Sequence, residues 1–368
     1  MSTDEMRADA PAIRQHPIAV SPNTASGKAP RSRSLLPVTR LFLGMAAALV
    51  ALDHAVAADM TILNVSYDPT GQFYAAFDKA FAAHWHTETG EQITIDRSTG
   101  SSGTQARAVM NGLDADVVTL GVASDIDALA KAGLVAKNWR SRLPDDSCPY
   151  TSTIVFLVRK GNPKDIRDCD DLERSTVSVV TPNPKTSSGG RWSFLAAWGW
   201  ALDHWGGDQG KARNFVTEIY RGAPVLDTGA RAAAIDFTRR GIGDVLLTCE
   251  NEAMLATHES GKGQFEIVRP SESILAEPPV TLVDRIVDAR GTRGATEAYL
   301  NYLYSDIGQE LAAKNYNRPR SESVAARHAE EFPPLKLFTV AEKFGGWDAV
   351  QAKYFADGGV FDQIYAPS

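Results

Sequence analysis

Four short segments of this sequence combine residues that can hold an anion. Residues 66–70, 98–103, 183–192 and 227–231 contain small polar residues and glycine, and each lies between a predicted strand and a predicted helix. In a parallel α/β sheet, such junctions lie beyond the carboxyl ends of the strands. Their N–H groups and the positive helix ends attract negative charge without a fixed countercharge. One such loop is ordinary turn and cap chemistry, whereas four predict a shared anion site.

The residues that could carry out catalysis do not form a known constellation. No glycine-rich loop ends in the Gly-Lys-Ser/Thr of a P-loop. Ser102 lies in Gly-Ser-Ser-Gly, not in the Gly-x-Ser-x-Gly of a nucleophile elbow. His84 and His86 are two positions apart, on different helix faces, and do not make a metal pair. An exported hydrolase with Ser102 or Ser187 as nucleophile stays open as an alternative, although a general base beside either serine is missing. We expect a binding protein, not an enzyme, with no metal and no cofactor.

The charge balance argues against a nucleic-acid partner. The 368 residues include 38 Lys and Arg against 45 Asp and Glu, a formal net charge of −7. Basic residues do not cluster outside the N-terminal segment, whereas nucleic-acid binders draw much of their affinity from a basic surface. With 43% hydrophobic and 23% charged residues, the composition is that of a globular protein.

The N-terminal segment has the features of a secretory signal peptide. Basic residues between positions 31 and 40 precede the apolar run 41–52, and Ala55-Val56-Ala57 follows as a small-x-small cleavage signal. The run is shorter than the about 20 residues of a membrane-spanning helix, which disfavours the alternative of a membrane anchor. We therefore expect residues 1–57 to be a signal peptide with a long n-region, cleaved after Ala57, and the mature protein to be exported.

Three cysteines cannot form a full disulfide framework. In an oxidising compartment Cys148 and Cys169 could pair. Two free, partly buried thiols are the favoured interpretation, because the sequence does not place their Cα atoms within bonding range.

Strands and helices alternate along the rest of the chain. A strand over residues 61–65 precedes a helix over 72–88, in which Phe73, Phe77 and Phe81 recur every four residues. Further strand–helix pairs predict α/β architecture with a mostly parallel sheet. Two lobes fit this length better than one sheet.

Several sequence blocks resemble those of periplasmic sulfate-binding proteins. These are residues 66–70, 183–187, 226–231 and 241–246, together with 317–320, 344–347 and 355–359. The resemblance extends from about Thr61 to Tyr365. It implies a two-lobed type II periplasmic binding protein, each lobe a mostly parallel sheet flanked by helices. It also implies a monomer in the periplasm that binds sulfate and delivers it to the membrane permease of an ABC transporter. Thiosulfate, molybdate and phosphate are the alternative ligands.

On the same resemblance, the chain divides into segments after its signal peptide. The first lobe is expected to comprise residues 58–150 and 272–330, and the second lobe residues 151–271. The helical tail of residues 331–368 is not assigned to either lobe.

The resemblance also carries the anion contacts over to individual residues. The expected donors are the Asp68 N–H, Ser102 through its hydroxyl with its N–H as an additional donor, the Ser187 hydroxyl, and the N–H groups of Ser188, Gly189 and Ala230. Arg231 is expected to support the site without touching the anion. This sequence departs from the family pattern at Cys249, where a Trp indole N–H is usual, and at Ser188, where Gly is usual.

The chemistry of the donors bears on which oxyanion binds. Sulfate has no proton to donate, so a site made of N–H and O–H donors suits it. A carboxylate aimed at the anion would favour hydrogen phosphate and would leave a buried acceptor unpaired against sulfate. Asp68 is the one acid predicted to contact the anion. If its N–H faces the anion, as the family pattern favours, sulfate is the better ligand.

Overall fold

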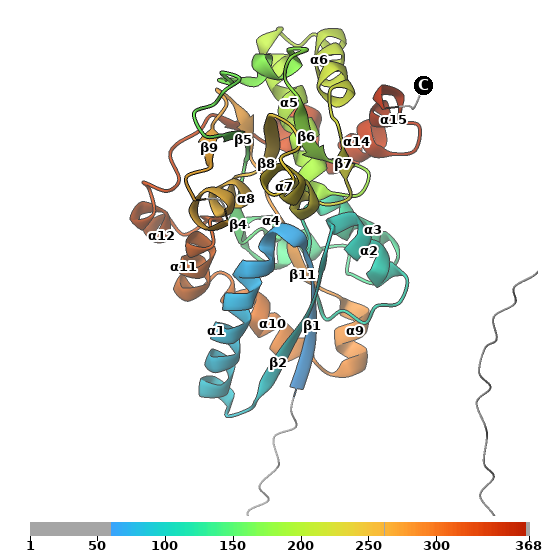
Figure 1. The fold of residues 1–368 in the computed structure, drawn as a ribbon. Helices are drawn as coiled ribbons and strands as arrows, with labels where there is room; N and C mark the ends of the chain where they lie inside the picture. Colours follow the sequence, from blue (N-terminus) through green and yellow to red (C-terminus); the bar gives the residue numbers. More distant parts are fainter. Residues whose placement is uncertain (1–59, 261, 366–368) are drawn as a thin grey trace, which may run out of the picture. The chain divides into compact units, whose positions relative to one another are not determined.

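The computed structural model describes residues 60–260 and 262–365. The predicted signal peptide and its cleavage site lie outside the described residues. The described residues belong to one compact unit, whose elements are drawn in Figure 1. In the described part of the chain, no helix is both long and apolar enough to cross a bilayer.

The first sheet has four strands in the order β11-β3-β1-β2. Its strands are β1 (Met60–Tyr67), β2 (Ile93–Gly100), β3 (Val117–Thr119) and β11 (Val280–Leu282). β1 runs parallel to β2 and β3, whereas β11 is antiparallel to β3. The helices that accompany this sheet are α1 (Gly71–Thr89), α2 (Ser102–Met110), α3 (Ala123–Lys131), α9 (Asp284–Arg290), α10 (Arg293–Tyr302), α11 (Asp306–Lys314) and α12 (Glu322–Arg327).

The helix predicted over residues 72–88 is α1, and its packing explains the spacing of its aromatic residues. Phe73, Phe77 and Phe81 are buried on one face. Phe77 and Phe81 each meet the ring of Tyr299 edge-on at a centroid distance of 5.1 Å. The helix ends at Gly90, whose φ of 76° is the left-handed conformation that glycine adopts without strain.

The second sheet has five strands in the order β7-β6-β8-β5-β9. Its strands are β5 (Ile154–Arg159), β6 (Val179–Pro182), β7 (Leu226–Asp227), β8 (Val245–Cys249) and β9 (Phe265–Val268). β6 runs parallel to β7 and β8, and β5 is antiparallel to both β8 and β9. One strand in each sheet, β5 here and β11 in the first, thus runs against the others, and the predicted mostly parallel α/β class is confirmed.

Three main helices and the short α8 accompany the second sheet, and the C-terminal tail adds three more short helices. They are α5 (Ser188–His204), α6 (Gln209–Arg221), α7 (Ala230–Thr238), α8 (Glu250–Leu255), α13 (Val340–Phe344), α14 (Trp347–Val350) and α15 (Val360–Ile364). The tail packs against α5, because Trp347 meets Trp192 and Tyr354 meets Phe194.

Short pairings lie where the chain passes between the two sheets. β4 (Tyr150–Thr151) pairs with β12 (Arg318–Pro319), and β10 (Ser273–Ile274) pairs with β13 (Leu337–Phe338). An isolated bridge joins Ser152 to Ala276. The remaining turns of helix are α4 (Pro144–Ser147) with 3₁₀ turns at Asp68–Thr70, Trp139–Arg142 and Cys169–Glu173, and π turns at Ala256–Ser260 and Gln351–Phe355.

Candidate anion site

The start of α5 supplies the first part of the site. β6 ends at Pro182, and the loop that follows leads to Ser187, the N-cap of α5. The Ser187 Oγ accepts a hydrogen bond from the Gly190 N–H at 3.4 Å, and the residue is buried. Because α5 is 17 residues long, its aligned peptide dipoles give the N-terminus a positive partial charge.

The start of α7 lies next to the start of α5. A Cβ added to Gly189 would lie 3.0 Å from the Ala230 Cβ and 3.5 Å from the Ser187 Oγ. Two helix N-termini from the second sheet therefore converge, and their first N–H groups have no partner within the helix. This is the arrangement that the sequence predicted for Ser187, Ser188, Gly189 and Ala230.

The start of α2, from the first sheet, brings Ser102 to the same place. The Ser102 Oγ donates to the Asp125 Oδ2 at 2.6 Å and accepts from the Gly121 N–H at 3.0 Å. Its proton is thus held by a carboxylate, and the donor that Ser102 leaves for an anion is its N–H. The hydroxyl contact expected from the resemblance would require the hydroxyl to turn away from Asp125.

Asp68 bridges from the end of β1 to the start of α7. Its Oδ2 accepts from the Arg231 N–H at 3.1 Å, and a Cβ added to Gly229 would lie 2.5 Å from the same oxygen. Burial raises the pKa of the Asp68 carboxyl, and the Arg231 N–H opposes that rise. The carboxylate therefore already accepts a hydrogen bond from the Arg231 N–H, and the backbone N–H of Asp68 also helps to lower its pKa.

Arg231 turns its side chain to an acid behind the site. Its Nη1 lies 3.2 Å from the Glu252 Oε2. Burial raises the pKa of Glu252 to about 7, although the Arg231 guanidinium lowers it. With its guanidinium paired to a buried carboxylate, Arg231 is placed to orient the start of α7.

Cys249 lies at the end of β8, where it is buried. Burial, followed by the charges of Glu252 and Asp68, raises the pKa of its thiol to about 12. The thiol is therefore neutral and a weak donor. Cys148 and Cys169 are also buried, and both are free thiols in the structure.

Loops of the two sheets also contact each other directly. The Gly103 N–H donates to the Thr186 carbonyl at 3.3 Å. The Trp192 Nε1 donates to the Gly121 carbonyl at 2.8 Å, and the Asn251 amide donates to the Pro69 carbonyl at 3.1 Å. The four predicted loops thus surround one point. The loops of the two sheets are in direct contact around it.

Some residues around this point were not predicted from the sequence. Asp125 pairs with Arg191 at 2.7 Å, and both side chains are buried. Gly121 and Glu252 were missed as well. Asp125 follows the predicted cap Ser124, but nothing in the sequence relates it to Ser102 or to Arg191.

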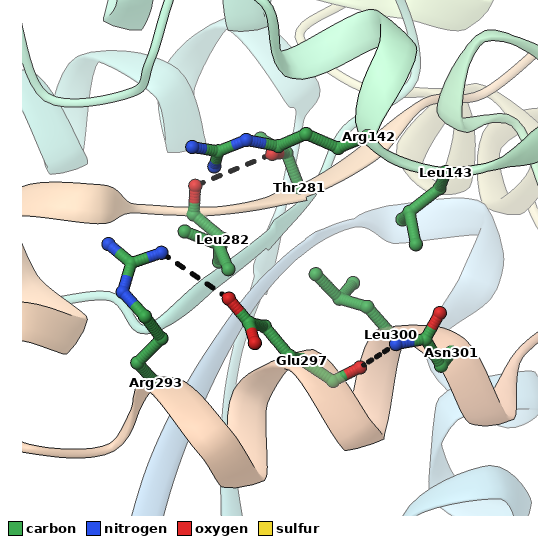
Figure 2. A pocket seen from close by; sticks show the side chains of 8 residues that line it. All are labelled: Arg142, Leu143, Thr281, Leu282, Arg293, Glu297, Leu300 and Asn301. Carbon is green, nitrogen blue, oxygen red and sulfur yellow. Dashed lines mark hydrogen bonds and ion pairs between the residues drawn. The ribbon is translucent and has the colours of Figure 1, made fainter.

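A separate pocket of about 300 Å³ lies on the first sheet's side of the molecule. Figure 2 shows it between β11 and α10, lined by Arg142, Leu143, Thr281, Leu282, Arg293, Glu297, Leu300 and Asn301. Its two guanidiniums are neutralised, because both pair with Asp284 and Arg293 also pairs with Glu297. None of the predicted anion residues lines it, and its charge does not favour an anion. Among the described residues there is no cluster suited to a metal ion.

Comparisons with known proteins agree with this geometry. A sequence model of the family described as bacterial extracellular solute-binding protein matches residues 70–316. The chain is 57% identical to the sulfate-binding protein of Escherichia coli over 316 residues, which is 86% of this chain and 96% of that protein. The chain belongs to the periplasmic sulfate-binding protein family.

Other members of this family differ in the ligand that their names state. The thiosulfate-binding protein of Pseudomonas aeruginosa is 52% identical over 89% of this chain and 99% of its own length. The solved structure of the sulfate-binding protein SubI from Mycobacterium tuberculosis superposes with a TM-score of 0.73 at 34% identity, covering 80% of this chain and 98% of that one. The two-lobed type II periplasmic binding fold predicted from the sequence is confirmed.

Proposed function

We propose that this protein binds sulfate between its two lobes in the periplasm and delivers it to the membrane permease of an ABC transporter. The observation that carries the proposal is the convergence of the starts of α2, α5 and α7 on one point, with backbone N–H groups as the available donors. The guanidiniums of Arg191 and Arg231 pair with Asp125 and Glu252 instead. A site of neutral donors suits an oxyanion that carries no proton.

The engagement of Asp68 bears on the choice between sulfate and phosphate. The Asp68 carboxylate accepts a hydrogen bond from the Arg231 N–H. It is therefore not positioned as an unpaired acceptor for the proton of hydrogen phosphate. This supports sulfate over phosphate. Thiosulfate is a second candidate, since relatives of nearly equal identity are named for sulfate and for thiosulfate.

The structure also bears on whether the protein is an enzyme. We infer that the protein performs no chemistry, since Asp125, the carboxylate beside Ser102, is already paired with Arg191 and so makes a poor general base. We infer a monomer, a signal peptide cleaved after Ala57, and lobes divided near residues 150, 271 and 330.

The proposal is tested by calorimetric titration of the purified mature protein. Sulfate, thiosulfate, molybdate and phosphate are titrated separately in one buffer. We expect sulfate to bind most tightly or to share that rank with thiosulfate, and phosphate to bind far more weakly. A phosphate affinity equal to that of sulfate would contradict the donor-only site.

A further inference from the structure

The side chain of Ser188 is largely buried at the start of α5, and its hydroxyl has no hydrogen-bond partner among the described residues. Ser188 is the first residue of α5 and is 2% exposed. Within residues 60–260 and 262–365, no hydrogen bond involves its Oγ. The neighbouring groups at the start of a helix are N–H donors. Unlike the Ser193 Oγ, the Ser188 Oγ is not among the fully buried polar atoms without a partner, so it stays accessible to a small ligand. What this hydroxyl lacks is an acceptor.

Gly121 of the first lobe lies directly opposite this hydroxyl. A Cβ added at Gly121 would lie 2.0 Å from the Ser188 Oγ and 3.1 Å from the ring of Tyr67. The Gly121 N–H donates to Ser102, and its carbonyl accepts from Trp192. Gly121 therefore makes hydrogen bonds to residues of both lobes. The Ser188 hydroxyl can pack against Gly121 because glycine has no side chain.

The surroundings of the hydroxyl are the loops of the anion site itself. Tyr67 immediately precedes Asp68, and Gly121 is bonded to Ser102. We propose that the Ser188 hydroxyl donates a hydrogen bond to the bound oxyanion, in the space that Gly121 leaves open. The inference rests on the proposed function, because it adds a donor to the same site. It also gives this chain a hydroxyl donor where Cys249 provides only a weak thiol donor.

Ser193 provides a matched control for this proposal. It lies on the same helix, is buried, and its hydroxyl also has no partner. It is outside the loops that converge on the site. Sulfate is titrated into the wild-type protein and into Ser188→Ala and Ser193→Ala. We expect about 10- to 100-fold weaker sulfate binding for Ser188→Ala, the effect of losing one hydrogen bond to a charged group, and unchanged binding for Ser193→Ala.

The outcomes separate this inference from the proposed function. If the wild-type protein binds neither sulfate nor thiosulfate, the proposed function fails. If the wild-type protein binds sulfate and Ser188→Ala binds it equally well, the function stands and the Ser188 proposal is overturned. Thermal unfolding of each variant without ligand establishes that it is folded.

A second pair of variants tests the position of the hydroxyl. Gly121→Ala should lower sulfate affinity in the wild-type background, because its Cβ would collide with the Ser188 Oγ. In a Ser188→Gly background the same substitution should cost much less. Equal losses in both backgrounds would mean that the two positions do not face each other in the bound form, and would overturn the proposal.

Discussion

Asp125 on α3 and Arg191 on α5 form a buried ion pair that joins the two lobes, although they lie 66 positions apart in the sequence. The Arg191 Nη1 lies 2.7 Å from the Asp125 Oδ1, while the other carboxylate oxygen of Asp125 holds the Ser102 hydroxyl. Arg191 also donates to the Pro184 carbonyl in the loop before α5. One ion pair thus connects the starts of α2 and α5 on either side of the candidate anion site.

The Asp125–Arg191 pair should matter for stability as well as for binding. In Arg191→Ala, the Asp125 carboxylate stays buried without its partner, which typically costs about 3–5 kcal/mol. We expect a loss of that size in the free energy of unfolding, measured by urea denaturation without ligand, together with weaker sulfate binding.

The exposed pair between Lys131 and Asp348 is the matched control. It joins α3 to α14 at 3.4 Å with both side chains mostly in solvent, so Lys131→Ala should cost about 0–1 kcal/mol. A loss for Arg191→Ala no larger than this would show that the buried pair is not formed in solution.

Ser187→Ala should weaken sulfate binding by about 1.5–3 kcal/mol, the value of one charge-assisted hydrogen bond. The substitution also removes the N-cap contact to Gly190, which is worth about 0.5–2 kcal/mol of stability. Titration and thermal unfolding of the same variant measure the two effects separately.

Arg231→Ala is the comparison for Ser187→Ala. Its guanidinium pairs with Glu252, so its removal should weaken binding less. A larger effect from Arg231→Ala than from Ser187→Ala would mean that the guanidinium reaches the anion.

The order of the loops along the chain and the convergence of Ser187, Gly189 and Ala230 could be predicted from the sequence. Helix caps and glycines after strands are local signals, and their place at one edge of a parallel sheet follows from topology. The direction of the Asp68 carboxylate could not be predicted, because it depends on Arg231, which is 163 positions away. The contacts of Glu252 with Arg231 and of Gly121 with Ser188 could not be predicted either, because they join separate elements and depend on the tertiary packing.

Sulfate affinity should fall as pH rises through about 7. Burial raises the pKa of Glu252 to about 7, against the lowering effect of Arg231, and a dianion bound nearby would raise it further. Binding therefore takes up a proton around this pH. Titrations from about pH 6 to 8, in buffers of different ionisation enthalpy, measure that uptake. Glu252→Gln should flatten the pH dependence, and an unchanged profile would exclude Glu252 as its source.

The same carboxyl predicts the pH dependence of stability without ligand. Its folded-state pKa of about 7 lies above the ordinary value of 4.5, so the folded state binds more protons between these values. The contribution of Glu252 to the free energy of unfolding should therefore decrease as pH rises from about 4.5 to 7 and stay level above that. Denaturation of the wild-type protein and of Glu252→Gln at several pH values isolates this contribution.

Cys249 should set the preference between sulfate and thiosulfate. The neutral thiol is a weaker and shorter donor than the indole that occupies this position in the family pattern, and it leaves the buried end of β8 roomier. The terminal sulfur of thiosulfate is larger than oxygen and a poorer hydrogen-bond acceptor. Thiosulfate affinity should therefore be reduced less beside the small thiol of Cys249 than beside an indole donor. We therefore expect the ratio of sulfate to thiosulfate affinity to be lower in the wild-type protein than in Cys249→Trp, titrated with both anions in one buffer.

Cys169→Ala removes a buried thiol outside the four loops and should leave the ratio unchanged. If Cys249→Trp folds and leaves the ratio unchanged as well, residue 249 does not line the anion site.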